Sequence, residues 1–322
     1  MMKRRIAFGI ILMIVLVASS VWAQKNVRLS IVTGGTGGVY YPLGGGLANI
    51  ISKYIPYADA TAEVTTASVD NCLLVGKGKA DIAFTMADTA WDAYMGQGKG
   101  FKEKIPLRAI AVFYPNNMHV VTIEGKRIEK VTDLKGKRVS TGAPGSGTEI
   151  VALRVLEAYG LNPDKDLSRD KLGASESGGA LKDGKIDAYF WVGGLPTASV
   201  TDLAATPGTK MKLIGHADAV PKMREKYGPL YVKGVIPART YPGQDMDVPI
   251  VVLWNLLVCN ESMKENVAYD IVKALFDHKP ELMTVHSDAK YLSLEPQATG
   301  GSPIPFHPGA IRYFTEKGLK IK

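Results

Sequence analysis

VRLSIVTGGTGGVYYP, residues 27–42, is the stretch that decides the fold of this chain. A β-like apolar run, 27–32, passes through a glycine-rich turn into a helix-like run around 43–54. The same order recurs where strand-like 137–141 leads into GAPGSGTE, residues 142–149, and a helix. Glycine lets backbone approach a ligand, and the free N–H groups that open a helix carry partial positive charge. The two turns therefore predict a clamp around a small anion.

Short apolar runs alternate with helix-like segments along the chain, which is typical of an α/β protein with parallel or mixed sheets. Ser68 is a natural N-cap with Asp70 in the first turn of its helix, and residues 115–117 read as a turn between two strands. The expected strands are 27–32, 61–66, 80–85, 107–114, 118–123, 137–141, 186–191 and 248–258. The expected helices include 43–54, 88–95, one ending at Tyr159, 176–183, one opened by residues 193–196, and others within 261–278 and near the C-terminus.

The first 23 residues have the pattern of a cleavable signal peptide. Lys3 to Arg5 precede an apolar stretch from Ile6 to Val17, and Ala23 offers a small residue before the cut. As a membrane anchor this stretch is too short to span a bilayer comfortably. Gln24, not Cys, follows, which disfavours a bacterial lipid anchor. We expect a mature protein in the periplasm.

Removing 23 of the 322 residues leaves 299, more than one hydrophobic core usually organises. We expect two α/β lobes, with the first split around the second. The expected bounds are 24–117 for the first part of lobe 1, 118–248 for lobe 2, and 249–322 for the return strand and the rest of lobe 1.

Composition excludes several classes of function. The formal charge of +8 falls to +5 without Lys3, Arg4 and Arg5, and no Lys/Arg-rich block points to nucleic acid. The five histidines are dispersed without H-E-x-x-H, so we expect no enzyme, no cofactor and no metal. Cys72 and Cys259 lie in apolar runs, which favours buried free thiols, although an oxidising compartment leaves a disulfide possible.

Several motifs in order resemble the TAXI-type substrate-binding subunits of tripartite ATP-independent periplasmic (TRAP) transporters. The resemblance covers nearly the whole mature chain. It rests on TGGTGGVYYP (33–42), SVDN (68–71), GKAD (78–81), DLKGKRV (133–139), GAPGSGTE (142–149), DGKIDA (183–188), GGLP (193–196) and YPGQD (241–245).

This resemblance implies a type II periplasmic-binding-protein fold, with two α/β lobes, two hinge crossings and a ligand cleft between the lobes. It also implies transport: a monomeric periplasmic solute-binding protein that carries a small carboxylate to TRAP permease subunits in the membrane. A glutamate-like amino acid, a 2-oxo acid or a dicarboxylate is the implied ligand. The alternatives are a solute-binding protein of an ABC importer or the ligand-binding module of a sensor; a periplasmic enzyme is disfavoured.

The candidate ligand-binding residues come from the two glycine turns, from the segment around Trp191, and from positions that the resemblance marks. Hydroxyls and unshielded N–H groups of the turns would hold the anion, and the aromatic side chains would wall it. A tight strand-to-helix connection without a ligand is the alternative for the first turn, an N-cap at Ser146 is the alternative for the second turn, and a core position is the alternative for Trp191. Arg138 and Arg154 are candidates for an arginine clamp on the anion, but a surface position is favoured for each. The candidates are Thr33, Gly35, Thr36, Gly37, Gly38, Tyr40, Tyr41, Ser68, Met86, Ser146, Gly147, Thr148, Trp191, Gly193 and Gly194.

Overall fold

The computed structural model describes residues 27–321, in which ten strands form one mixed, strongly bent sheet. The predicted signal peptide, residues 1–23, lies outside the described residues. The strand order is β2-β1-β3-β10-β4-β7-β5-β6, with β8 paired to β4 and β9 paired to β10. The strands are β1 (Val27–Val32), β2 (Ala58–Glu63), β3 (Ile82–Met86), β4 (Leu107–Ile123), β5 (Arg138–Ser140), β6 (Ser168–Asp170), β7 (Ala188–Gly193), β8 (Met211–Leu213), β9 (Val232–Ile236) and β10 (Val248–Asn260).

Helices cover both ends of this sheet. The α-helices are α2 (Tyr40–Tyr54), α3 (Ser68–Gly76), α4 (Ala87–Met95), α5 (Gly147–Ala158), α6 (Ala174–Lys182), α7 (Ala198–Ala204), α8 (Val220–Tyr227), α9 (Glu265–Asp277), α10 (Lys279–Val285), α11 (Glu295–Ala298) and α12 (Pro308–Glu316). Short 3-10 turns are η1 (Val131–Leu134), η2 (Ala217–Ala219) and η3 (Ser287–Tyr291). Among residues 27–321, no helix combines the length and the apolar character that crossing a bilayer requires.

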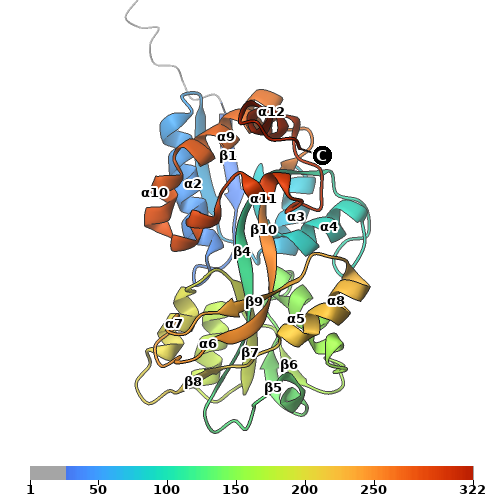
Figure 1. Cartoon of the computed structure of the whole chain (residues 1–322), viewed down its shortest axis with the longest axis vertical. Coiled ribbons are helices and arrows are strands. Elements are labelled where there is room, and N and C mark those ends of the chain that lie inside the picture. The colour runs from blue at the N-terminus through green and yellow to red at the C-terminus, as the bar shows by residue number, and fades with distance from the viewer. Residues whose placement is uncertain (1–26, 322) are drawn as a thin grey trace, which may run out of the picture.

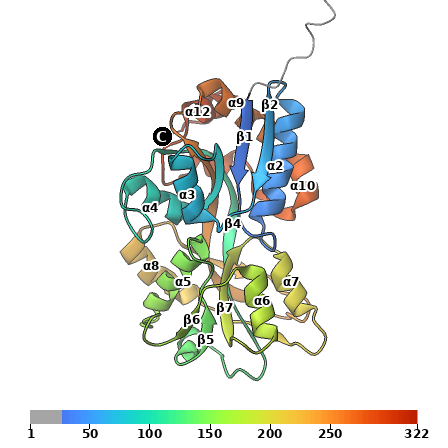
Figure 2. The same cartoon turned by 180° about the vertical axis from the view of Figure 1, so that it is seen from behind.

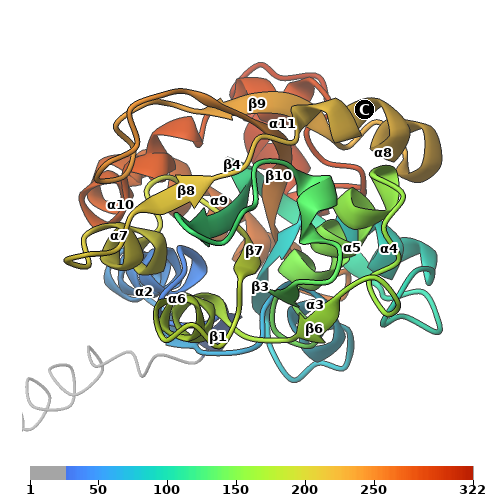
Figure 3. The same ribbon diagram turned by 90° about the horizontal axis from the view of Figure 1, so that it is seen from below.

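Two lobes are visible, and β4 and β10 run through both of them (Figure 1). The upper lobe holds β1 to β3 with α2 to α4 and α9 to α12, and the lower lobe holds β5 to β9 with α5 to α8 (Figures 1 and 2). Seen from below, α6 and α7 lie to one side of the lower lobe, and α5 and α8 lie to the other (Figure 3). The α/β architecture with two lobes is therefore confirmed.

Each lobe has its own apolar core. The larger cluster combines side chains of residues 29–114 with side chains of 256–314, and the second combines side chains of 118–253. Two residues pack into the core of the opposite lobe: Ile150 of α5 belongs to the upper cluster, and Met86 at the end of β3 belongs to the lower one. Because apolar contact between the lobes is local to these positions, most of each core does not depend on the other lobe.

The turn predicted at residues 115–117 is wrong, because β4 is one continuous strand of 17 residues. Pro115, Asn116 and Asn117 pair with β10 at the point where both strands pass between the lobes. The Asn116 amide bonds the side chains of Tyr40 and Asn255. The Asn116 side chain therefore donates to buried partners from within a strand, where the sequence pattern alone indicated a turn.

Other local predictions are confirmed. The Ser146 hydroxyl accepts the N–H of Glu149 and caps α5, and Asp70 lies in the first turn of α3. Cys72 and Cys259 are buried free thiols.

Two histidines are buried in the lower lobe and serve packing. His119 Nδ1 lies 2.9 Å from the carbonyl oxygen of Asn117, and its Nε2 lies 2.8 Å from the Tyr241 hydroxyl. His216 Nδ1 lies 2.9 Å from the carbonyl oxygen of Ile214. Burial lowers the pKa of each imidazole to about 4, so both are neutral near pH 7.

Candidate ligand-binding site

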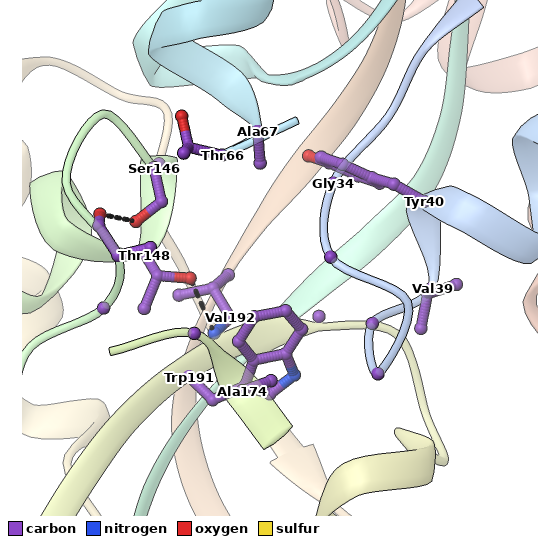
Figure 4. A pocket seen from close by; sticks show the side chains of 18 of the residues that line it. Gly34, Val39, Tyr40, Thr66, Ala67, Ser146, Thr148, Ala174, Trp191 and Val192 are labelled. Carbon is purple, nitrogen blue, oxygen red and sulfur yellow. Dashed lines mark hydrogen bonds between the residues drawn. The ribbon is translucent and has the colours of Figure 1, made fainter. Parts of the chain in front are cut away.

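A cavity of about 300 Å³ lies between the lobes, beside the strand crossing. Its lining comes from seven separated parts of the chain, and Figure 4 shows ten of these residues labelled. The lining residues are Gly34, Gly35, Thr36, Gly37, Gly38, Val39, Tyr40, Val64, Thr65, Thr66, Ala67, Met86, Tyr114, Asn116, Gly142, Ala143, Ser146, Gly147, Thr148, Leu172, Gly173, Ala174, Ser175, Glu176, Trp191, Val192 and Gly193.

Three helices begin at this cavity. The residues that open α2, α5 and α6, namely Tyr40, Gly147 and Ala174, all line it. The first N–H groups of a helix have no partner within the helix, and its N-terminus carries roughly half a positive charge. Only α5 of these three has a side-chain cap, from Ser146. Backbone donors from both lobes are therefore available to one negatively charged group.

The walls are largely apolar. Tyr40 enters from α2 and Trp191 enters from β7 (Figure 4), and Met86, Leu172 and Val192 also line the cavity. The Trp191 indole N–H donates to the Thr197 hydroxyl at 3.1 Å, which fixes the orientation of the ring. An aromatic plate in a fixed orientation offers contact area to the body of a ligand.

Neutral polar groups line the cavity where the strands cross. Tyr40 donates its hydroxyl hydrogen to Asn255 Oδ1, and the Asn116 amide donates to the same oxygen. Among residues 27–321, the Tyr114 hydroxyl and Asn116 Oδ1 are buried without a hydrogen-bond partner. Buried polar groups usually have partners, so these two atoms are candidates to contact a ligand.

No cationic side chain lines the cavity within the described part of the chain, and Glu176 is its one charged lining residue. The basic residues nearest in sequence to this wall are engaged elsewhere: Lys171 and Arg169 lie 3.4 and 4.0 Å from Glu149. Lys99 approaches the same carboxylate at 3.4 Å. The positive potential in the cavity therefore comes mainly from backbone groups.

The glycine turns touch the opposite lobe. The Gly145 carbonyl accepts the N–H groups of Val69 and Asp70, at 3.1 and 3.3 Å, and the Gly37 carbonyl accepts that of Ser199 at 3.4 Å. A Cβ atom placed on Gly147 would lie 2.7 Å from Ser68 Oγ and 2.8 Å from Met86 Sδ. Glycine at 147 is thus required for the lobes to approach this closely.

A buried ionic cluster also joins the lobes, and we call its four members, Arg154, Asp88, Asp92 and Tyr231, the Arg154 cluster. One guanidinium nitrogen lies 3.0 Å from Asp88 Oδ2, and the other bonds Asp92. The Tyr231 hydroxyl lies 2.6 Å from Asp88 Oδ2. Burial raises the pKa of Asp92, and the guanidinium opposes that rise. The surface position predicted for Arg154 is wrong, since it is 8% exposed; Arg138 does lie at the surface, paired with Asp187.

Most of the predicted site residues meet at this cavity. Those that line it are Gly35, Thr36, Gly37, Gly38, Tyr40, Met86, Ser146, Gly147, Thr148, Trp191 and Gly193. Whether they bind a ligand stays a prediction.

Four predicted residues do not line the cavity. The Thr33 hydroxyl donates to the Glu63 carbonyl at 2.6 Å and so joins β1 to β2. Ser68 is the first residue of α3, and its buried hydroxyl accepts the Met86 N–H instead of capping the helix. Tyr41 follows Tyr40 around the helix and lies on its exposed side. Gly194 is buried between the lobes, where the neighbouring N–H of Leu195 donates to Asp288.

The sequence prediction missed the start of α6. Residues 173–176 line the cavity, whereas the helix was expected to begin at Glu176. A signal was present: Gly173 and Ser175 precede a glutamate in what becomes the first helical turn, where a carboxylate is favoured. Tyr114 and Asn116 were missed because they belong to strand β4, which was expected to end at a turn.

Comparison with known proteins gives a family and a fold. The model of the NMT1-like family matches residues 31–318. The aliphatic sulphonate binding protein SsuA of Escherichia coli superposes with a TM-score of 0.50 at 16% identity, over 90% of this chain and 83% of that one. The binding component of an ABC phosphonate transporter from Pseudomonas aeruginosa gives 0.54 at 11%, over 83% and 80%. MatC of Rhodopseudomonas palustris with bound malate gives 0.54 at 14%, over 90% and 96%.

These structural similarities confirm the periplasmic-binding-protein fold. Because the sequence identities are low, they show the fold and nothing more specific. They also correct the family predicted from the motifs. The matching family is NMT1-like, and a title among the similar structures names an ABC transporter, so the assignment to TAXI-type subunits and to a TRAP permease partner is withdrawn. A glycine turn before a helix suits anion binding in unrelated proteins, so such motifs discriminate poorly between families.

Proposed function

This chain belongs to the NMT1-like family, and from that premise we propose that it is a periplasmic solute-binding protein, not an enzyme, that delivers a small organic anion to an importer. The observation that carries the proposal is the meeting of three helix N-termini, from both lobes, at one cavity of about 300 Å³. An anion placed there gains backbone donors from α2 on one side and from α5 and α6 on the other.

We also propose that the lobes close around the ligand. Residues of both lobes form the cavity, so a bound ligand contacts both only when they are near each other. A ligand that gains contacts in one state shifts the population toward that state. The crossings of β4 and β10 are the places where hinge motion would occur. The bounds 24–117, 118–248 and 249–322 are part of this proposal.

Backbone donors suffice for useful affinity. Each hydrogen bond to a charged group contributes about 1.5 to 3 kcal/mol, and a partly buried helix N-terminus contributes up to about 2 kcal/mol. Several together reach about 8 kcal/mol, which corresponds to a micromolar dissociation constant, after ordering costs are subtracted.

Native mass spectrometry of the full chain, purified after export from a bacterial host, tests this function. We expect a retained small molecule that is released on denaturation and carries an acidic group. A panel of organic acids, added to the emptied protein, then identifies ligands by thermal shift, since a ligand at 100 times its dissociation constant adds about 2.7 kcal/mol of stability. Turnover of a panel compound, or a panel without any binder, would contradict the proposal.

We propose an ABC importer as the partner, because one structure of the same fold is titled as the binding component of such a transporter. Uptake in vesicles that contain the partner permease should then require ATP inside the vesicle. Uptake driven by an ion gradient without ATP would refute the ABC assignment and leave the solute-binding function standing.

A further inference from the structure

We infer that the ligand is an organic acid with a single negative charge and an otherwise uncharged body. This inference rests on the proposed function and narrows its ligand. The cavity supplies backbone donors for an anionic group, and among residues 27–321 its lining offers no cationic side chain for a second one. A glutamate-like amino acid or a dicarboxylate, each with a further charged group, is therefore disfavoured.

Each glycine turn reaches the opposite lobe. Gly147 of the second turn contacts Ser68 and Met86 of the upper lobe, and Gly37 of the first turn contacts Ser199 of the lower lobe. Each helix N-terminus is equivalent to roughly half a positive charge, and the effect falls off within the first turn. Donors of this kind suit one compact anionic group that sits between the turns.

A second carboxylate would have to lie against the rest of the wall. There it would meet the apolar side chains of Leu172, Val192 and Met86, or the carboxylate of Glu176. The remaining polar lining, which includes Thr65, Thr66 and Ser175, is neutral, so a second carboxylate would have no cationic partner among the described residues. The neighbouring cation Lys171 is engaged with Glu149. A desolvated charge without a partner is strongly unfavourable, and a nearby like charge makes it more so.

An ammonium group on the ligand would also lack a strong counter-ion in the cavity. Within the described part of the chain Glu176 is the one lining carboxylate, and it is exposed at the third position of α6, where its charge already stabilises the helix N-terminus. Screening by solvent makes an exposed ion pair weak.

Neutral polar groups on the ligand do have partners. Tyr114 and Asn116 line the cavity, and the Tyr114 hydroxyl and Asn116 Oδ1 are buried without a hydrogen bond among the described residues. A hydroxyl or amide on the ligand would satisfy them without bringing a charge. The cavity has a volume of about 300 Å³. A water molecule takes up about 30 Å³ in the liquid, so the cavity has room for a ligand of roughly ten non-hydrogen atoms.

Isothermal titration of the emptied full chain with hexanoate, adipate and norleucine tests the inference. The three compounds share a six-carbon chain and differ in carrying one negative charge, two negative charges, or a carboxylate with an ammonium group. We expect hexanoate to bind at least about 100-fold more tightly than adipate, because the second carboxylate of adipate would be buried without a cationic partner. Norleucine should be at least about tenfold weaker than hexanoate.

The outcomes separate the two proposals. Adipate or norleucine binding as tightly as hexanoate overturns the single-charge inference and leaves the solute-binding function in place. Failure of hexanoate and of every other organic acid tested overturns both.

A variant tests the same point from the protein side. Leu172→Arg places a cation on the wall, and Leu172→Met is the matched control without a charge. We expect Leu172→Arg to shift the adipate-to-hexanoate affinity ratio at least about tenfold toward adipate, and Leu172→Met to leave the ratio within about twofold. An unchanged ratio in a folded Leu172→Arg protein would show that the body of the ligand does not lie on this wall, and would overturn the inference.

Discussion

Replacing Gly147 with alanine tests whether binding requires the lobes to meet. The new Cβ would lie 2.7 Å from Ser68 Oγ, 3.0 Å from Ser68 Cβ and 2.8 Å from Met86 Sδ, all in the opposite lobe. Carbon atoms pack at about 3.5 to 4.0 Å, so the lobes must separate by roughly 0.5 to 1 Å. Overpacking of this kind costs about 1 to 3 kcal/mol.

This cost falls on the closed state alone, because Gly147 contacts those atoms only across the lobe interface. Gly147→Ala should therefore weaken ligand binding by about 5- to 150-fold and leave the melting temperature of the emptied protein nearly unchanged. Gly179→Ala is the matched control: Gly179 lies in α6 outside the cavity lining, and a Cβ there meets nothing within 4 Å.

Titration calorimetry with the ligand released from the native protein measures the effect, and thermal melting of the emptied proteins controls for folding. We expect Gly179→Ala to bind within about threefold of the unmodified protein, since no steric conflict accompanies it. Equal weakening in both variants, or an unchanged dissociation constant for Gly147→Ala, would refute the reasoning.

Three further predictions concern stability. Arg154→Met leaves the two carboxylates of the Arg154 cluster buried without a counter-ion and should lower the free energy of unfolding by about 3 to 5 kcal/mol in urea titration; a loss below about 1 kcal/mol would contradict this. The pKa of His119 and that of His216 fall to about 4 on folding, below the unfolded value of about 6.5, so their stabilisation is complete above pH 6.5 and is lost as pH falls toward 4. The contribution of each histidine to the free energy of unfolding should fall by about 2 kcal/mol between pH 7 and pH 5. His216→Gln should therefore show a fall in the free energy of unfolding that is smaller by that amount, and an equal fall in the variant and the unmodified protein would argue against this prediction. Tyr114→Phe removes a buried hydroxyl without a partner, so the emptied protein should be no less stable, and a loss above about 1 kcal/mol would show that the hydroxyl is satisfied.

Local sequence signals predicted the parts of the site that are themselves local. Each glycine turn lies between its strand and its helix within a few residues, so the pattern at 27–42 and 142–149 specified both the connection and the direction of the donors. Ser146 was identified as a helix cap for the same reason, since it needs only the N–H of Glu149.

The sequence-based predictions that failed concern contacts between distant segments of the chain. Arg154 reads as a surface residue on an amphipathic helix, and nothing in its neighbourhood shows that Asp88 and Asp92, more than 60 positions earlier, surround it. Asn116 follows a proline and precedes another asparagine, which favours a turn until Asn255 is placed beside it. Thr33 was expected in the cavity because it precedes the glycines, but the carbonyl of Glu63 in the neighbouring strand takes its hydroxyl.

A crystal structure of the protein with its retained or titrated ligand tests the central claim most directly. The account predicts the acidic group of the ligand within hydrogen-bond distance of backbone N–H groups at Gly147 or Thr148 and at the turn that contains Gly37. Density for the ligand outside the cavity between the lobes, or an acidic group held by a lysine or arginine side chain in place of these backbone donors, would contradict it.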